Sequence, residues 1–336
     1  MRLVGEILKW LGIGLGCLLV TGAIYQLVGT VLDGKLAPPA SDMVSVNGHK
    51  IHLICMGEGP RSFVLDAGAA IGAVEWWRLQ TRLARAGRVC AFDRAGLGWS
   101  EWSNDPHDAG TSAGDLAALV KAVKIPTPFI YIGHSLGANI GLVYREKYPG
   151  DVSALVLIEP GRPEDLLEGF HGTRDEAMRQ QSDCGFTCYL AGAAGYVGIP
   201  RLAAQLLVTG HANLDGRARE EYRAQAARPS NVMAALATLD ALPKTAYEDL
   251  DVHGFGDTPV LIYVSSEDFK DAPFSDVAEY RKFRVAQHDY FTSLAAMSTR
   301  GKGPIIVPNS DHASMVMGEK QSSLLAQQII VFVSHN

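Results

Sequence analysis

Short runs of apolar residues rich in Val and Ile recur along the chain after residue 43. Near-continuous apolar strands are typical of a sheet covered on both faces, and therefore of a largely parallel sheet. A weaker run at 43–48 lies directly before the first of them with no helix between, which predicts an antiparallel edge hairpin over 44–56. The expected strands are 51–56, 62–66, 88–92, 129–133, 154–158, 259–264 and 303–307.

Helix-like segments separate several of these strands, at 75–86, 112–123, 136–148 and 322–334. Alternation of strands and helices predicts an α/β fold with helices on both faces of the sheet. Strands stop between 161 and 250, where the sequence is rich in Ala, Arg, Gln and Glu. We expect this segment to form a helical cap over the carboxyl edge of the sheet, where such sheets bind ligands. The core is then 44–160 and 251–336.

The N-terminal segment 10–32 contains no charged residue, and roughly 20 apolar residues suffice to cross a bilayer as a helix. We interpret it as an uncleaved transmembrane anchor, with a cleaved export signal or a buried helix as the alternatives. Arg2 and Lys9 precede it, which weakly predicts a cytoplasmic 1–9 and an extracytoplasmic location for the chain after a linker at 33–43; Glu6 reduces that bias.

The formal net charge is −6, and acidic and basic residues are mixed. No basic stripe is present, so a nucleic-acid partner is not expected. The five cysteines lack the paired spacing of a zinc site, so we expect no metal. Cys184 and Cys188 are close enough in sequence to bridge, and Cys55 and Cys90 fall on two predicted strands; the sequence leaves open whether either pair is a disulfide. It also leaves the oligomeric state open.

In the segment "FIYIGHSLGANIG", residues 129–141, a predicted buried strand is followed by a Gly-x-Ser-x-Gly turn and then by the start of a predicted helix. The small residues Gly133 and Gly137 let strand and helix approach closely around Ser135. There the helix dipole and the free N–H groups favour a developing negative charge. The pattern predicts a nucleophilic serine, which needs a base and an acid that orients the base.

Two later strands end in the residue types that this chemistry requires. "PVLIYVSSED" closes on Glu267 and Asp268, and "PIIVPNSDH" closes on Asp311 and His312. The order Ser, acid, His, each at a strand end, is that of one fold. With "FVLDAGAA", "CAFDRAGLGWS" and "LVLIEP", these motifs make residues 44–334 resemble the α/β-hydrolase family, in its bacterial esterase, lipase and aminopeptidase-like branch with a helical cap.

The resemblance implies Ser135 as nucleophile, His312 as base and Asp268 as the acid, with Glu267 and Glu159 as alternative acids. It implies an oxyanion hole made by the backbone N–H groups of Leu136 and Ala69, with Ala70 as the alternative to Ala69. The family's common His-Gly at the oxyanion loop is replaced here by Ala67-Gly68. Asp93 and Arg94, in the second motif, are interpreted as a structural pair that holds loops.

The implied reaction is cofactor-free hydrolysis of a carboxylic ester through an acyl-enzyme. An apolar cap and a membrane anchor favour a small-molecule substrate with a hydrophobic, lipid-like acyl group. Related enzymes that open epoxides place an aspartate at the elbow, so Ser135 disfavours that chemistry. The alternatives are a proline-iminopeptidase-like aminopeptidase, cofactor-free lyase or perhydrolase chemistry, and a non-catalytic binding module of the same fold.

Overall fold

The computed structural model describes residues 2–38, 40–179, 185–207, 214, 216–267 and 276–335. Within these residues one sheet has the strand order β1-β2-β4-β3-β5-β6-β7-β8. β1 and β2 form the expected antiparallel edge hairpin, β2 is antiparallel to β4, and the remaining pairs are parallel. The strands are β1 (Met43–Val46), β2 (His49–Met56), β3 (Ser62–Asp66), β4 (Arg88–Phe92), β5 (Phe129–His134), β6 (Val152–Ile158), β7 (Val260–Ser265) and β8 (Gly301–Val307).

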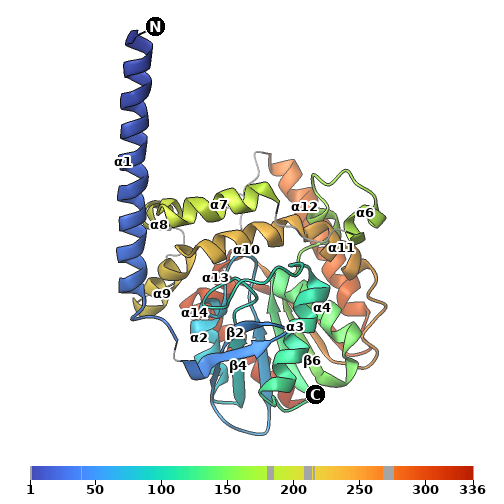
Figure 1. Ribbon diagram of the computed structural model, residues 1–336. Helices are drawn as coiled ribbons and strands as arrows, with labels where there is room; N and C mark the ends of the chain where they lie inside the picture. The colour runs from blue at the N-terminus through green and yellow to red at the C-terminus, as the bar shows by residue number, and fades with distance from the viewer. Residues whose placement is uncertain are drawn as a thin grey trace.

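Helices cover both faces of the sheet, which confirms the predicted α/β architecture (Figure 1). Alternate residues of each central strand enter opposite cores: Val64 packs on one side, while Phe63 and Leu65 pack on the other. The first core is closed by α3 (Ala109–Ala122), α4 (Leu136–Lys147) and α12 (Val277–Ala296), and the second by α2 (Trp77–Leu83), preceded by η2 (Ala73–Trp76), and α14 (Glu319–Ser334).

A set of helices lies between β6 and β7 in the chain, where the cap is predicted. It contacts the segments that follow the parallel strands: Asn231 accepts a bond from Gly98 N in the loop after β4, and Asp249 accepts one from Asn139 in the helix after β5. The set therefore covers the carboxyl edge of the sheet. The helices are α5 (Pro163–Leu166), α6 (Arg174–Arg179), α7 (Phe186–Tyr196), α8 (Ile199–Leu207), α9 (Gly216–Ala226), α10 (Pro229–Asp240) and α11 (Leu242–Leu250).

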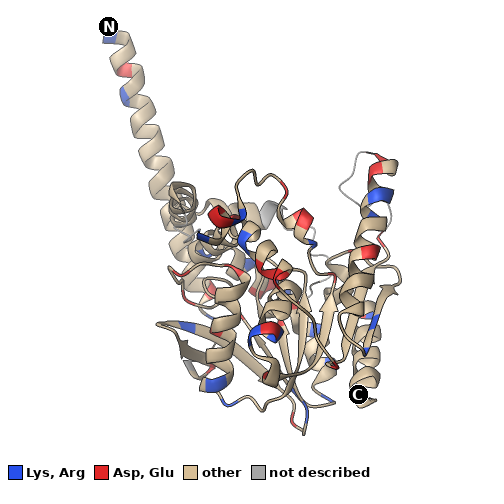
Figure 2. Cartoon of the chain, turned by 90° about the vertical axis from the view of Figure 1, so that its right-hand side faces the viewer, with Lys and Arg blue, Asp and Glu red and all other residues tan. Residues whose placement is uncertain are grey.

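The N-terminal segment forms one long helix, α1 (Arg2–Asp33), which extends the predicted 10–32 at both ends. Its N-terminal half stands clear of the body of the molecule (Figure 1). Beyond the first turns it carries no charged side chain until it reaches the body (Figure 2). By length and hydropathy α1 qualifies as a membrane span, and such a helix near an N-terminus also fits a signal sequence.

Cys55 on β2 and Cys90 on β4 face each other in register and form a disulfide. The bridge closes a loop with a sequence separation of 35 residues. Loops of that size stabilise a fold by about 4 kcal/mol in the chain-entropy description. Cys184 lies outside the described residues, so the question whether Cys184 and Cys188 bridge stays open.

Gly137, at the first turn of α4, tests how closely this helix must approach β3. A Cβ added there would lie 2.2 Å from Asp66 O and 2.6 Å from Ala67 O. Because these are backbone atoms, α4 would have to move. We expect Gly137→Ala to cost at least about 3 kcal/mol and to lower the thermal midpoint of the full chain in detergent.

The matched control is Gly114→Ala in the middle of α3, where an added Cβ would have no atom within 4 Å. Removing glycine from a helix interior raises stability by roughly 0.5–1 kcal/mol. The two variants should therefore move the midpoint in opposite directions. Equal midpoints for both would contradict the close packing of α4 on β3.

Candidate active site

The carboxyl ends of the central parallel strands meet at one edge of the sheet. In register, Asp66 of β3 lies beside Gly133 of β5, and His134 of β5 lies beside Ile158 of β6. Three non-glycine residues at or just beyond these ends have positive φ: Ala70 (60°), Ser135 (52°) and Glu159 (48°). Such strained backbone persists where the surroundings enforce it, and it is typical of functional sites.

Ser135 occupies the sharp turn between β5 and α4, with φ 52° and ψ −124°. Its backbone N–H donates to Ile158 O at 2.9 Å, which fixes the turn against β6. The residue is half-buried, and its hydroxyl makes no hydrogen bond to any residue that the structure describes. A Cβ built on Gly68 would lie 3.5 Å from Ser135 Cβ, so the loop after β3 passes directly beside the serine.

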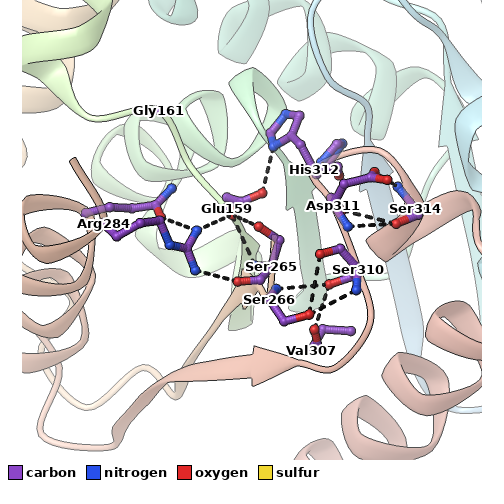
Figure 3. Close-up of polar contacts among 12 residues, drawn as sticks. Glu159, Gly161, Ser265, Ser266, Arg284, Val307, Ser310, Asp311, His312 and Ser314 are labelled. Carbon is purple, nitrogen blue, oxygen red and sulfur yellow. Dashed lines mark hydrogen bonds and ion pairs between the residues drawn. The ribbon is translucent and has the colours of Figure 1, made fainter. Parts of the chain in front are cut away.

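His312 follows β8 and is brought to the same edge. Its Nδ1 lies 2.8 Å from Oε2 of Glu159, the residue that follows β6 (Figure 3). An ionised carboxylate accepts hydrogen bonds only, so Nδ1 carries the hydrogen and Nε2 of the neutral ring is left as the basic atom. The loop is held by a turn in which Ser314 N donates to Asp311 Oδ1 at 2.8 Å.

Glu159 is buried, and its other oxygen is also satisfied. Oε1 accepts from the backbone N–H of Ser265 at 3.1 Å and from its hydroxyl at 2.7 Å, and Arg284 Nη1 lies 3.8 Å away. Burial acts to raise the pKa of Glu159, but the bonds from His312 and Ser265 outweigh it and lower the pKa to about 2. The carboxylate therefore stays ionised at neutral pH.

The contact between Glu159 and His312 also shifts the pKa of His312. Desolvation acts to lower the pKa of the imidazole, but the hydrogen bond and negative charge of Glu159 prevail and raise it above its ordinary 6.5. Glu267 is partly buried and has a pKa raised by desolvation and by the nearby charge of Glu159. Its carboxylate makes no bond to His312 among the described contacts.

Two of the three candidate acids, Glu159 and Glu267, are among the described residues. Asp268, the first candidate, lies outside the described residues. Among the described residues the partner of His312 Nδ1 is Glu159, which the sequence offered only as an alternative. Ser135, His312 and Glu159 are thus brought to one sheet edge from the ends of β5, β8 and β6.

The two predicted oxyanion donors flank Ser135. Leu136 is the first residue of α4, and Ala69 lies in the loop after β3. Neither backbone N–H donates to another residue in the described part of the chain. The loop after β3 is fixed by Arg94, whose guanidinium donates to the carbonyl oxygens of Ala67 and Gly68 and pairs with Asp66.

A second buried carboxylate–histidine pair lies beside the first. His134 Nδ1 is 2.7 Å from Glu75 Oε1, and His134 Nε2 is 3.0 Å from His312 O. Glu75 Oε2 also accepts from Gly68 N at 2.8 Å. Burial acts to raise the pKa of Glu75, but the charge of His134 lowers it. Sequence reasoning missed Glu75 as the partner of His134.

Asp93 holds loops, in agreement with its structural interpretation. Its carboxylate accepts from Ala73 N at 2.6 Å and Trp99 N at 2.8 Å, and it pairs with His52 Nδ1 at 2.7 Å. No group of three or more metal-ligating side chains occurs among the described residues.

With this geometry in place, comparison with known proteins is informative. Residues 63–326 match the family model described as the alpha/beta hydrolase family. The chain belongs to the alpha/beta hydrolase family. Solved structures of this fold superpose on most of the hydrolase: a Vigna radiata epoxide hydrolase mutant (TM-score 0.64, 17% identity, 88% of this chain and 98% of that chain) and an esterase from Exiguobacterium antarcticum (0.60, 17%, 87% and 98%). At such identities the likeness concerns the fold.

Sequence relatives are more partial. The hydrolase is 28% identical over 174 residues to the uncharacterized protein YbdG of Bacillus subtilis (strain 168), covering 50% of this chain and 53% of that protein. It is 35% identical over 95 residues to an AB hydrolase superfamily protein of Gibberella zeae, covering 28% of this chain and 29% of that protein. The chain therefore spans about half or less of the length of these curated relatives.

Proposed function

We propose that the protein is a serine hydrolase that cleaves carboxylic esters through Ser135, His312 and Glu159. The observation that carries the proposal is the ionised Glu159 bound to His312 Nδ1 at the sheet edge where Ser135 adopts a strained turn. His134 connects the Ser135 turn with the His312 loop. It directly precedes Ser135 in the chain, and the centroid of its ring lies 4.5 Å from the centroid of the His312 ring.

In this reaction Ser135 Oγ attacks the ester carbonyl while His312 Nε2 takes its proton. The N–H groups of Leu136 and Ala69 stabilise the resulting oxyanion, and the imidazolium, held by Glu159, gives the proton to the leaving alcohol. Water, deprotonated by the same His312 Nε2, then attacks the acyl-serine and releases the acid. The products are one alcohol and one carboxylic acid, and the enzyme is regenerated.

A carboxylic ester suits the nucleophile better than an epoxide does. The superposed structures include both esterases and epoxide hydrolases, so the fold alone leaves both open. Serine acts in acyl transfer because a tetrahedral oxyanion can form against the two amides. The aminopeptidase alternative would need an acid to hold the amino group of the substrate. Of the four acids at 159–168, Glu159 is bound to His312 and Asp165 to Arg162 at 2.7 Å, which leaves Glu164 and Glu168 for that role.

The test is a substrate panel given to the full chain in detergent: nitrophenyl esters of increasing acyl length, aminoacyl nitroanilides and a styrene-type epoxide. We expect turnover of the esters with a burst of nitrophenol, and no turnover of the epoxide. Faster cleavage of prolyl nitroanilide than of every ester would move the assignment to the aminopeptidase. No turnover of any compound by folded protein would favour the non-catalytic alternative.

The pH dependence follows from the raised pKa of His312. Glu159 favours the protonated imidazole, whereas catalysis needs the neutral one, so kcat/KM should rise with pH through a midpoint above 6.5. In Glu159→Gln the charge is gone, and the residual activity should show a midpoint at lower pH. A pH–rate series on both proteins measures this. An unchanged or higher midpoint in the variant would contradict the assignment of Glu159.

We also propose that α1 anchors the hydrolase in a membrane with the catalytic domain on the extracytoplasmic side. The apolar length of α1 supports the anchor, and the charges of Arg2 and Lys9 in its first turns support the orientation. The Cys55–Cys90 disulfide supports it as well, because such bonds persist in oxidising compartments. A membrane location would fit esters with a hydrophobic acyl group.

A further inference from the structure

Two cap helices, α7 and α8, expose a row of large apolar side chains. Their exposed fractions range from 51% to 82%, and the row follows helical spacing along both helices. From Gly185 to Leu207 Arg201 is the sole charged residue. We call this surface the α7–α8 face; it consists of Phe186, Tyr189, Leu190, Tyr196, Ile199 and Leu202.

The face points away from the rest of the cap. On the opposite side of α7, Gly192 and Gly195 pack so closely that an added Cβ would lie 2.6 Å from Met233 Sδ and 2.9 Å from Pro229 Cα. Both partners belong to α10. α7 therefore buries its small residues against α10 and turns its aromatic ones outward, and the described residues supply no cover for them.

The same two helices hold the lower half of α1. Gln26 of α1 is buried, donates to Ala227 O at 3.1 Å and accepts from Arg201 Nε at 2.9 Å. Arg201 Nη2 also pairs with Asp33 at 2.7 Å. At Gly22 an added Cβ would lie 2.4 Å from Val197 O, at the end of α7. The charge of Arg201 is thus turned inward, and α1 is fixed relative to the α7–α8 face.

This docking leaves α1 too short to cross a bilayer on its uncharged part alone. On the N-terminal side of Gly22, the charge-free part of α1 is residues 10–21, and these twelve residues span about 18 Å along the helix axis. A hydrocarbon core is about 30 Å thick. A membrane span that begins at Trp10 needs about 20 residues and therefore ends near Gly29. It includes the positions of α1 that Val197 and Arg201 contact.

We propose that the α7–α8 face lies in the outer leaflet of the membrane and is a second membrane-binding element beside α1. The proposal rests on α1 being the anchor. The depth from Gly22 to Gly29, about 10 Å, matches the 5–10 Å to which amphipathic helices enter the boundary of headgroups and acyl chains. Tyr189 and Tyr196 suit that boundary, since their rings are apolar and their hydroxyls reach water.

The orientation also accounts for the charges elsewhere. Figure 1 shows α7 and α8 against α1, whereas α12 rises on the far side of the molecule. The first two turns of α12 carry Glu279, Arg281 and Lys282, which suit the polar headgroup layer. Membrane helices are commonly tilted by about 20°. A tilt of α1 toward the side of the α7–α8 face would bring this face closer to the lipid than α12.

The test is photo-crosslinking in the full chain, reconstituted in nanodiscs of phosphatidylcholine and phosphatidylglycerol with an alkyne-tagged phosphatidylcholine. The photoreactive p-benzoylphenylalanine replaces Tyr196 or, in a second protein, Tyr189. Replacement of Trp10 gives the reference for a membrane-spanning position. Replacement of Trp77, 38% exposed on α2, gives the reference for an exposed aromatic outside the α7–α8 face. Thermal midpoints and ester turnover establish that each protein is folded.

We expect lipid adducts at positions 196 and 189 within about twofold of those at position 10, and background yield at position 77. Background yield at 196 and 189 beside strong yield at 10 would overturn the proposal and leave the anchor intact. Adducts between protein chains at 196 would overturn it in favour of a second copy as the occupant. Background yield at position 10 would overturn the anchor itself, and the proposal with it.

Discussion

Replacing Ser135 with alanine should reduce ester turnover by about 10⁶-fold while leaving the protein folded. Ser135 Oγ is the atom that forms the acyl bond, and its side chain makes no hydrogen bond in the described part of the chain, so its loss removes chemistry rather than packing. The remaining activity comes from the oxyanion donors and from substrate binding. Initial rates with a nitrophenyl ester, together with the thermal midpoint, measure both effects.

The matched control is Ser293→Ala on α12, which removes an exposed hydroxyl that donates to Asp289 O at 2.9 Å. This variant should turn over at the parent rate. Retention of more than about a hundredth of the parent rate by Ser135→Ala, with the contaminating esterases of the host excluded by a mock purification, would refute Ser135 as the nucleophile.

The second large effect concerns the acid. Glu159→Gln should lower kcat by about 10³- to 10⁴-fold, because an amide can leave the wrong nitrogen of His312 protonated and cannot stabilise the imidazolium. Asp268→Asn should stay within about threefold of the parent, since His312 Nδ1 is bound by Glu159. Steady-state kinetics of the two variants, one isosteric change each, decide between the acids.

If Glu159 served only in packing, its replacement would change the stability of the protein but not the pH dependence of catalysis. Two further measurements separate a packing role from a role in orienting His312. Glu159→Asp keeps the charge on a shorter side chain and should recover part of kcat. The lowered pH midpoint should appear in Glu159→Gln and be absent in Glu159→Asp. If Asp268→Asn shows the 10³-fold loss instead, the acid is Asp268 and the assignment of Glu159 fails.

The sequence predicted the parts of this site that depend on local pattern. A strand, a Gly-x-Ser-x-Gly turn and a helix follow one another around Ser135, and His312 follows the last strand, so both residues could be placed at one edge. The acid could not be settled in this way, because β6 and β7 both end in carboxylates. Pairing depends on the positive φ of Glu159 and on Ser265 and Arg284, which lie 106 and 125 positions later.

The fold was predicted to a similar extent. Apolar runs located the strands and their antiparallel edge hairpin, since burial on both faces leaves a continuous signal. α12 was missed: its inward residues Tyr280, Gln287, Phe291 and Leu294 are separated by charged and polar positions, which blur the apolar stripe. Glu75 was missed because its partner His134 is 59 positions away, and only the folded chain brings them together.

The most direct test of the central claim is the identity of a covalent adduct. The full chain in detergent is treated with a fluorophosphonate, which reacts with serine hydroxyls activated by a neighbouring base, and the adduct is located by mass spectrometry of peptides. We expect one modification, on Ser135, that is lost in Ser135→Ala and strongly slowed in His312→Ala. An adduct on a different serine, or none on folded protein that hydrolyses esters, would contradict it.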